Sequence, residues 1–404
     1  MLFKLAWRNI WRNKRRSLIT IASIFVAVFL AVFMRSMQLG MYSSMIDNVV
    51  GAYTGYVQIH KKGYWEEQKV DNSLQAKPKL LQTITSTKGV KNIIPRLQIF
   101  TLASNGELAQ GVMVNGVIQD KENLLIDWGT RLNSGQLLSG KDDELVIAKG
   151  IAKIFEVELG DTMVFIGQGY HGTNAAGKYV ISGIVNLKNP KLNNISVFLN
   201  LKTAQNYIGA HNLLTHLIVD KKDIIDEEVL SSNLKSKLGK NYEIMTWREM
   251  IPELEQTIQA DSVAGLIMIF ILYMIITFGI FGTVLMMTQE RTYEFGVLVA
   301  IGMKKTKLAL TMILETIMLT LIGIFSGAVS VMPFAYYFHK NPIVLSGDYA
   351  DTMENFGFDP VIPLSIDLSI PLTHGFIIFL ISLIIALYPS WYIFKMDPVK
   401  SMKR

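Results

Sequence analysis

The stretch of this chain that comes closest to a chemical motif is Gly135 to Asp142, GQLLSGKD. It follows the phosphate-binding pattern G-x-x-x-x-G-K up to the last position, where a Ser or Thr hydroxyl should reach magnesium. Asp142 stands there instead, and its carboxylate would repel phosphate. No strong apolar strand precedes the stretch and no clear helix is expected after it. We therefore attribute the match to chance and do not expect this chain to hydrolyse ATP by itself.

The histidines offer no better catalytic or metal site. They are His60, His171, His211, His216, His339 and His374, and none stands in an H-E-x-x-H motif or another ligand spacing. The chain has no cysteine, so it has no thiolate site. Each histidine is interpreted as a surface or loop residue. We expect no catalytic residue, no metal and no cofactor in this chain.

A different pattern, the charged connector from Glu290 to Glu315, separates two long apolar segments. Four segments are free of charge over at least 18 residues, and a helix rising about 1.5 Å per residue needs this length to approach the thickness of a hydrocarbon core. They are Ser17–Met34, Val263–Met287, Thr316–Phe338 and Leu372–Phe394. The alternative, a buried core helix, rarely lacks charge over such a length. The sequence predicts an α-helical membrane protein with four transmembrane helices.

Basic residues indicate the orientation. Lys and Arg gather before the first span, in the connector and after the last span, and such residues are retained in the cytoplasm. Both termini and the connector are therefore expected to be cytoplasmic, and the insertion from Asp47 to Asp261 extracytoplasmic. The net charge of +6 follows from these inner segments, so nucleic-acid binding is excluded.

These assignments divide the chain into consecutive segments. From the N-terminus they are a cytoplasmic amphipathic helix (1–17), the first transmembrane helix with a stalk (18–46), an extracytoplasmic α+β domain (47–260), the second transmembrane helix (261–288), a cytoplasmic connector (289–307), the third transmembrane helix (308–338), an extracytoplasmic loop (339–371), the fourth transmembrane helix (372–394) and a cytoplasmic tail (395–404).

The first segment suits a helix lying in the inner membrane interface, because apolar and basic residues occupy different faces of its wheel. Aromatic rings would sit at headgroup depth and cations would meet lipid phosphate. The residues expected at this interface are Trp7, Arg8, Trp11, Arg15 and Arg16.

Strands and helices alternate irregularly in the extracytoplasmic domain. A hairpin is predicted for Ile93–Ala103 and Glu107–Val117, joined at Asn105-Gly106. Further strands are expected at Gly55–His60, Glu144–Ala148, Met163–Gly167, Tyr179–Val185, Ile195–Leu199 and Leu214–Val219, and helices at Lys149–Phe155, Lys202–Ile208 and Asp223–Leu238. Tyr170–Gly177, YHGTNAAG, is expected to form a glycine-rich loop between strands.

The connector also carries a family resemblance. Glu294 to Gly302, EFGVLVAIG, resembles the E-(I/F)-G-x-L-x-A-(I/L)-G signature of the FtsX-type ABC transporter permeases, which lies between their second and third spans. Tyr388-Pro389-Ser390-Trp391 with Met396-Asp397-Pro398-Val399 is similar to the family's ending, and Leu5 to Ile10 to its first helix. Glu144–Gly167 resembles part of the family's outer domain, the MacB-like periplasmic domain between helices 1 and 2.

The resemblance implies partners and a location. Members of the MacB, LolC and LolE type work in the bacterial inner membrane with a cytoplasmic ABC ATPase dimer, which binds the ATP and Mg²⁺. A second permease subunit, identical or homologous, would complete the membrane part. A periplasmic carrier and membrane lipid are further expected partners.

In this interpretation the connector couples the permease to the ATPase. The residues expected to do so are Glu294, Phe295, Gly296, Leu298, Ala300, Gly302 and Lys304. Phe295 and Leu298 would offer an apolar face to a groove of the partner, and Glu294 would pair with a partner cation. Gly296 and Gly302 would permit close approach or end the helix. The alternative is an ordinary connector without a partner.

Two features of the spans carry alternatives. Phe270, Tyr273, Met274 and Phe278 would line a cargo cavity for acyl chains, although plain helix packing explains them equally well. Glu315 is the one acidic residue well inside a span. It has either a working role or a place at the inner interface.

Two functions stay open at this stage. The first is a lipoprotein-releasing permease subunit, which the size of the outer insertion favours. The second is a mechanotransmission or regulatory FtsX-like subunit without cargo. Export of another hydrophobic substrate is a third reading, but MacB-type exporters carry the ATPase in the same chain and this sequence has none.

Overall fold

The computed structural model describes residues 2–12, 14–187, 189–222, 225–355 and 359–402, which form two compact units. The helical unit comprises Met1–Tyr42, Ile258–Val344 and Val361–Arg404, and the α/β unit comprises Ser43–Thr257 and Leu345–Pro360. The segment 339–371, predicted as one loop, is therefore shared between the two units.

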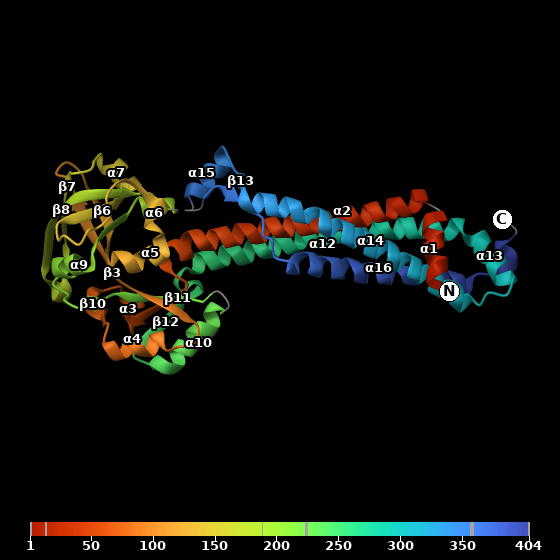
Figure 1. Ribbon diagram of the computed structural model, residues 1–404, viewed down its shortest axis with the longest axis horizontal. Coiled ribbons are helices and arrows are strands. Elements are labelled where there is room, and N and C mark those ends of the chain that lie inside the picture. The colour runs from red at the N-terminus through yellow and green to blue at the C-terminus, as the bar shows by residue number, and fades with distance from the viewer. Residues whose placement is uncertain (1, 13, 188, 223–224, 356–358, 403–404) are drawn as a thin grey trace. The chain divides into compact units, whose positions relative to one another are not determined.

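Four long helices build the helical unit (Figure 1). They are α2 (Lys14–Ile46), α12 (Pro252–Glu290), α14 (Lys305–Lys340) and α16 (Ser369–Lys395), and α2 continues into a wider π-type turn at Asp47–Thr54. In the part of the chain that is described, these are the helices long and apolar enough to cross a membrane. Each begins before its uncharged run, because charged residues at a span end reach the aqueous boundary without ending the helix.

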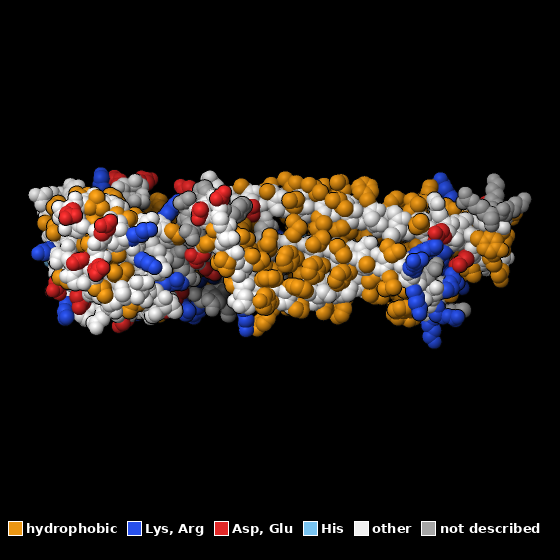
Figure 2. Space-filling view, turned by 90° about the horizontal axis from the view of Figure 1, so that it is seen from above, with side chains coloured by type: hydrophobic (Ala, Val, Ile, Leu, Met, Phe, Trp, Pro, Cys, Tyr) orange, Lys and Arg blue, Asp and Glu red, His pale blue; other side chains and the backbone are white. Residues whose placement is uncertain are grey.

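Shorter elements complete this unit. They are α1 (Leu2–Arg12), α13 (Thr292–Ala300), α17 (Pro398–Ser401) and the strand pair β13 (Ile343–Val344) with β14 (Val361–Ile362). Figure 1 shows α1, α13 and the C-terminal end of the chain at the same end of the long helices. Figure 2 shows apolar side chains along these helices, and Lys and Arg gathered at the end where α1 lies.

Helix α14 is the best packed of the long helices and α12 the least. Of its most apolar stretch, α14 buries 56% of the residues and α12 only 11%. Gly323 and Gly327 of α14 lie against Ile24 and Val28 of α2, so closely that an added Cβ would stand 2.6 and 2.9 Å from neighbouring atoms. Small residues allow two backbones to approach in this way. Helix α12 instead exposes an apolar face in the single chain.

A ten-stranded mixed sheet dominates the described part of the α/β unit, in the order β12-β1-β11-β3-β4-β9-β6-β8-β5, with β7 pairing β3 and β8. Its strands are β1 (Val57–Lys61), β3 (Val90–Ser104), β4 (Ala109–Val117), β5 (Leu132–Gly135), β6 (Glu144–Ala148), β7 (Thr162–Gln168), β8 (Asn174–Val185), β9 (Ser196–Asn200), β11 (His216–Lys221) and β12 (Tyr242–Thr246). A separate pair joins β2 (Leu74–Gln75) to β10 (Leu213–Leu214).

The same unit contains shorter helices. They are α3 (Tyr64–Glu67), α4 (Pro78–Thr85), α5 (Gln119–Ile126), α6 (Trp128–Arg131), α7 (Lys149–Phe155), α8 (Pro190–Asn193), α9 (Leu201–Ile208), α10 (Glu227–Leu238), α11 (Trp247–Met250) and α15 (Asp348–Asn355). Of these helices, α4, α7, α9 and α10 pack against the sheet.

The long strand β3 joins two lobes. Its first half pairs with β11, and with β1, β12, α4 and α10 it encloses one apolar core, which we call the small lobe. Its second half pairs with β4 and β7, and together with β6, β8, β9, α7 and α9 it forms the large lobe around a second core. One strand therefore belongs to both cores.

The predicted hairpin is confirmed as β3 and β4. The Asn105 side chain accepts hydrogen bonds from the amides of Glu107 and Leu108, and Gly106 takes φ +103°. The predicted loop Tyr170–Gly177 is wrong in its second half, because Asn174–Gly177 opens β8 and pairs with β7. Only the turn before Asn174 leaves the sheet. The predicted helix at Asp223–Leu238 begins at Glu227 in the structure, capped by Asp226, and Asp223 lies outside the described residues.

The segment resembling a phosphate loop has a different environment from one. Strand β6 follows it, where a phosphate loop would start a helix. The Ser139 amide donates to the Glu144 carboxylate at 2.7 Å. A backbone amide that could face phosphate is thus already satisfied by a carboxylate.

Two histidines lie inside the small lobe, which makes their prediction as surface or loop residues wrong. His60 of β1 and His216 of β11 are both buried, their ring centroids are 5.5 Å apart, and His60 stacks on Tyr64. Burial lowers the pKa of His60 to about 4 and that of His216 well below its ordinary value. Both rings are therefore neutral in the folded protein at neutral pH.

This burial predicts acid sensitivity. Between pH 6.5 and 4 an unfolded His60 binds a proton while the folded one does not, so stability falls as the pH drops through this window. At about 1.4 kcal/mol for each tenfold change in proton affinity, His60 alone should lower the free energy of unfolding by about 3 kcal/mol. Thermal unfolding of the full chain in detergent, followed by tryptophan fluorescence at several pH values, measures it. His60→Leu should remove much of the dependence and the exposed His211→Leu should retain it; equal pH dependence in all three proteins would contradict the assignment.

Candidate functional site

The connector between α12 and α14 folds as the short helix α13 with a well-defined end. The Gly302 amide donates to the Val299 carbonyl at 3.1 Å and the Met303 amide to the Leu298 carbonyl at 3.0 Å. Gly302 takes φ +101°, with open space around it. This is the hydrogen-bond pattern of a Schellman C-cap, in which glycine adopts the left-handed conformation. The predicted role of Gly302 in ending the helix is confirmed.

Phe295 does not lie on a docking surface, contrary to our prediction. Its side chain is fully buried in an apolar cluster with residues of α14 and the end of α16, among them Leu308, Met312 and Ile393. Helix α13 has apolar residues around most of its circumference, and periodicity alone does not tell which of them face the protein. Phe295 therefore fixes α13 to the spans.

Gly296 is also turned inward. A Cβ placed on it would stand 3.1 Å from the Ser401 Cβ and 3.2 Å from the Pro398 carbonyl oxygen. The missing side chain lets the C-terminal helix α17 lie directly against α13. Gly296 thus serves close packing within the chain.

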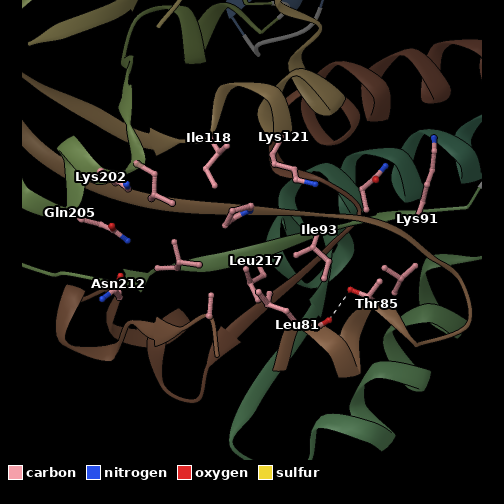
Figure 3. Close-up of a pocket in the computed structure, with 16 residues that line it drawn as sticks. Leu81, Thr85, Lys91, Ile93, Ile118, Lys121, Lys202, Gln205, Asn212 and Leu217 are labelled. Carbon is pink, nitrogen blue, oxygen red and sulfur yellow. Dashed lines mark hydrogen bonds between the residues drawn. The ribbon is translucent and has the colours of Figure 1, made fainter. Parts of the chain in front are cut away.

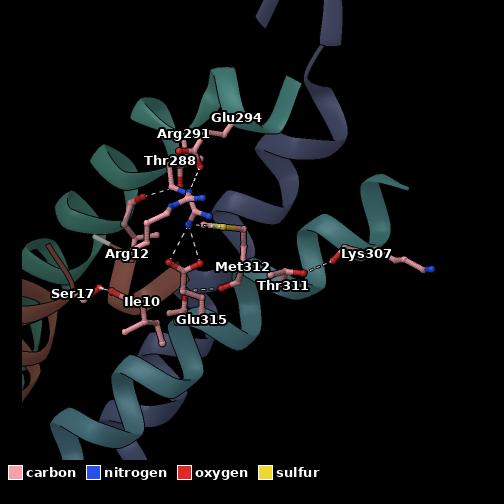
Figure 4. Close-up of polar contacts among 12 residues, drawn as sticks. Ile10, Arg12, Ser17, Thr288, Arg291, Glu294, Lys307, Thr311, Met312 and Glu315 are labelled. Carbon is pink, nitrogen blue, oxygen red and sulfur yellow. Dashed lines mark hydrogen bonds and ion pairs between the residues drawn. The ribbon is translucent and has the colours of Figure 1, made fainter. Parts of the chain in front are cut away.

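Arg291 is the centre of a charge network at this end of the helical unit (Figure 4). Its guanidinium donates to both carboxylate oxygens of Glu315, at 3.0 and 2.8 Å, and lies 3.3 Å from a carboxylate oxygen of Glu294. Arg291 is 7% and Glu315 4% exposed. Removing two charges from water is costly. Hydrogen bonds from one guanidinium nitrogen to both carboxylate oxygens offset much of that cost. The carboxylate within span three is therefore neutralised by a cation from the connector.

The network extends to the N-terminal segment. Arg12 forms an ion pair with Glu294, and Arg16 forms one with Glu290. Within the chain Glu294 already has two arginine partners, Arg12 and Arg291. Its pairing with a cation of a partner stays a prediction. The segments α1, α12, α13 and α14 are tied together by charge at one end.

Other connector residues remain exposed. The large apolar side chains among them are Tyr293, Leu298 and Ile301, which we call the connector face, and Ile301 is 80% exposed. Ala300, Gly302 and Lys304 are exposed beside them. Lys305 points inward, and its ammonium donates to the carbonyls of Phe394 and Met396 at the end of α16. The connector face is available to a partner, although it is smaller than the sequence suggested.

Helix α1 has the predicted amphipathic character. Ala6 and Ile10 are buried against the helical core. Trp7, Arg8, Trp11 and Arg15 are exposed, and the two indole rings meet edge to face at 5.8 Å. Arg16 is half-buried through its pair with Glu290.

The residues predicted to line a cargo cavity lie on the exposed face of α12. Phe270 and Phe278 are 68% and 69% exposed, and Met274 is exposed as well. Tyr273 instead forms a hydrogen bond with the Nδ1 atom of His374 on α16. A cavity at these residues would need a second subunit to close it.

An apolar groove occurs elsewhere in the helical unit, between α14 and α16. It measures about 640 Å³, and its lining includes Leu321, Phe325, Val329, Met332, Leu372 and Phe376. The sequence did not indicate this groove, because hydropathy identifies the spans but does not tell where two neighbouring helices leave a gap between them. The Arg291–Glu315 pair was also missed. Asking which cation neutralises Glu315 would have pointed to Arg291.

Comparisons with known proteins assign both parts of the chain. The model of the MacB-like periplasmic core domain matches residues 17–235, and that of the FtsX-like permease C-terminal matches residues 266–398. The macrolide export ATP-binding/permease protein MacB of Escherichia coli is 26% identical over 38% of this chain and 26% of its own length.

Two further relatives extend the comparison. MacB of Aggregatibacter actinomycetemcomitans is 23% identical over 80% of this chain and 51% of its own length. The lipoprotein-releasing system transmembrane protein LolC of Buchnera aphidicola is 22% identical over 54% of this chain and 52% of its own length. The chain thus spans about half or less of these curated relatives.

The buried ion pair predicts a large effect of removing one partner. Glu315→Gln leaves the Arg291 cation buried without its counter-charge, which typically costs about 3–5 kcal/mol and should lower the melting temperature clearly. The double variant Arg291→Met, Glu315→Leu should recover much of the loss, because apolar residues can replace a buried pair. The loss and its recovery are measured by heating each variant in detergent and determining, by size-exclusion chromatography, how much folded protein remains at each temperature.

A matched control tests the role of burial. Glu290→Gln removes one partner of the more exposed Arg16–Glu290 pair and should cost less than about 1 kcal/mol. If Glu315→Gln proved no less stable than Glu290→Gln, the buried pair would not stabilise the helical unit.

Proposed function

The chain belongs to the FtsX-like ABC transporter permeases that carry a MacB-like periplasmic core domain, and from this we propose that it extracts lipoproteins from the inner membrane. In this proposal a cytoplasmic ATPase dimer, formed by a separate chain, binds ATP and Mg²⁺ and drives the extraction. The released lipoprotein passes to a periplasmic carrier. The relative LolC, named for a lipoprotein-releasing system, supports this cargo.

The observation that carries the coupling part of the proposal is the construction of α13. Its inner side is fixed to the spans by Phe295 and the Arg291 network, while the connector face is exposed. A short helix with one side anchored and apolar residues on the other suits docking into a groove of a partner. Movement of the ATPase would then reach α14 through the Phe295 cluster and α12 through direct continuity of the chain.

Helix α12 provides a route from the connector to the α/β unit. It runs without interruption from Pro252 to Glu290, roughly 58 Å at about 1.5 Å per residue. We propose that both termini and α13 face the cytoplasm, which the basic residues at that end support. A displacement at Glu290 would thereby be delivered outside the membrane.

The exposed face of α12 supports a second permease subunit, either identical or homologous. Phe270, Met274 and Phe278 lie along it. A span with so little burial leaves a packing surface that another helix or cargo can occupy. In this proposal two such faces enclose the acyl chains of the lipoprotein.

Export of another hydrophobic substrate is the second candidate. It is favoured by the relatives themselves, because a macrolide export protein matches 80% of this chain and LolC only 54%. Both candidates use the same coupling site and differ in cargo. A regulatory subunit without cargo is the alternative that the experiments below must also separate.

Charge placed on the connector face should uncouple the complex. We expect Ile301→Asp, and more weakly Tyr293→Ala, to reduce ATPase activity in the assembled complex, for Ile301→Asp about 30-fold, as loss of an interface anchor typically costs about 2 kcal/mol. Insertion and melting temperature should be unchanged, because both residues are exposed. Glu294→Lys is unsuitable, since it would also break the pairs with Arg12 and Arg291.

The control for this experiment is Leu108→Asp, the same kind of charge at an exposed apolar residue in the α/β unit. It should leave coupled ATPase activity unchanged. Normal coupling in Ile301→Asp would reject the connector face as the docking site.

Depletion of the protein in its native cell tests the cargo. Fractionation of acylated lipoproteins should find them retained in the inner membrane. Normal sorting, combined with sensitivity to hydrophobic compounds, would favour export of another substrate. Normal sorting with defects in division or the cell wall would favour a regulatory subunit.

A further inference from the structure

A pocket of about 660 Å³ lies in the α/β unit where the small and large lobes meet (Figure 3). It is bordered by α4, the first half of β3, the start of α5 and the start of α9. Its size falls in the range of about 300–1,000 Å³ that is usual for small-molecule sites. Neither the family models nor the proposed function assigns a ligand to it.

Aliphatic side chains form the interior of this pocket. They include Leu81, Ile93, Pro95, Ile118, Leu214 and Leu217. Leu214 and Leu217 are buried. Figure 3 shows Ile93 and Leu217 in the middle of the residues that line the pocket. No aromatic residue is among the described residues that line it. An aliphatic chain fits such a lining better than a flat ring, which is usually held by aromatic contacts.

The charged groups of the lining all have the same sign. They are Lys91, Lys121 and Lys202, and no acidic side chain lines the pocket in the part of the chain that is described. Lys91 lies 3.9 Å from Asp220, so its charge is partly balanced. Lys121 and Lys202 are exposed and form no ion pair with any described residue. Two unbalanced cations stand at the mouth of an apolar pocket.

Two polar side chains of the pocket are held by hydrogen bonds within the unit. The Gln205 amide donates to the Leu213 carbonyl, and the Asn92 amide to Asp220. Leaving aliphatic surface open to water costs about 25 cal/mol per Å², so a concave patch of this kind is usually a site for a ligand. The ligand must be aliphatic inside and anionic at the opening.

We propose that this pocket binds the aliphatic chain of a single-chain amphiphile whose anionic head group, a carboxylate or a phosphate, is held by Lys121 and Lys202. The aliphatic lining selects the chain and the two ammonium groups select the charge. This inference goes beyond the proposed function, because it concerns binding to the α/β unit and needs neither the ATPase nor a lipoprotein.

Photocrosslinking of the full chain in zwitterionic lipid nanodiscs tests the proposal. The probe is hexadecanoate with a diazirine in the middle of the chain, and labelled peptides are identified by mass spectrometry. We expect labelling of peptides that contain Ile93, Ile118 or Leu217. The double variant Lys121→Glu, Lys202→Glu should reduce this labelling at least about fivefold, since each lost contact also becomes a repulsion.

Matched variants and probes decide the outcome. Lys153→Glu, Lys191→Glu makes the same charge change at two exposed lysines of the unit outside the pocket, and it should label like the wild type. Hexadecyl phosphate with the same diazirine distinguishes the head groups: labelling by one anion alone identifies it, and labelling by both supports a general anion site. Inorganic phosphate should not compete, because it has no chain.

Two results would overturn the proposal. One is equal labelling of these peptides by the uncharged hexadecanol analogue, and the other is undiminished labelling in the Lys121→Glu, Lys202→Glu variant. Absence of label from the pocket peptides would have the same meaning. Since the assay contains neither ATPase nor lipoprotein, its failure would leave the transport proposal intact, and failure of transport would leave this site intact.

Discussion

The ion pair between Arg291 and Glu315 is the constraint around which one end of the helical unit of this permease, where α1 and α13 lie, is arranged. A carboxylate within a span requires a partner, and the connector supplies one in Arg291. Because Arg291 faces the spans, Phe295, one helical turn further along the chain, faces them as well. Glu294 is then left beside Arg12, which ties the first helix to the same point. One buried pair thus helps to determine which side of α13 stays exposed.

The α/β unit has a comparable organiser in β3. Because a single strand takes part in two cores, the lobes share a backbone, and Leu201 packs against both cores. A pocket can persist at such a junction without disrupting either core. The buried histidine pair lies in the small lobe and has the character of a packing element rather than a ligand set.

Length, charge and turn chemistry were enough to predict much of this architecture. The four spans follow from uncharged runs, and the β3–β4 hairpin follows from Asn105-Gly106, because each signal is local. The inward turn of Phe295 depends on Leu308, Met312 and Ile393, and one partner of Glu294 is Arg12, 282 positions away. A local pattern does not contain such contacts. Asn174–Gly177 resembles a loop in composition and becomes strand only because β7 offers it hydrogen bonds. The residues of α12 that were predicted to line a cargo cavity were recognised as apolar. The sequence could not tell which face of α12 packs against the other helices and which is exposed.

The contact of Gly323 and Gly327 with α2 has a consequence for how the protein is made. Lys305, the first residue of α14, follows Ile46, the last residue of α2, by about 260 residues, which take roughly 13–50 s to synthesise at ~5–20 residues per second. During that interval α2 lies in the membrane without α14, while the large and small lobes are being synthesised. Helix α14 must therefore find, by lateral movement, a helix inserted long before it, and α16 follows later still. The two glycines shape the surface that α14 brings to α2.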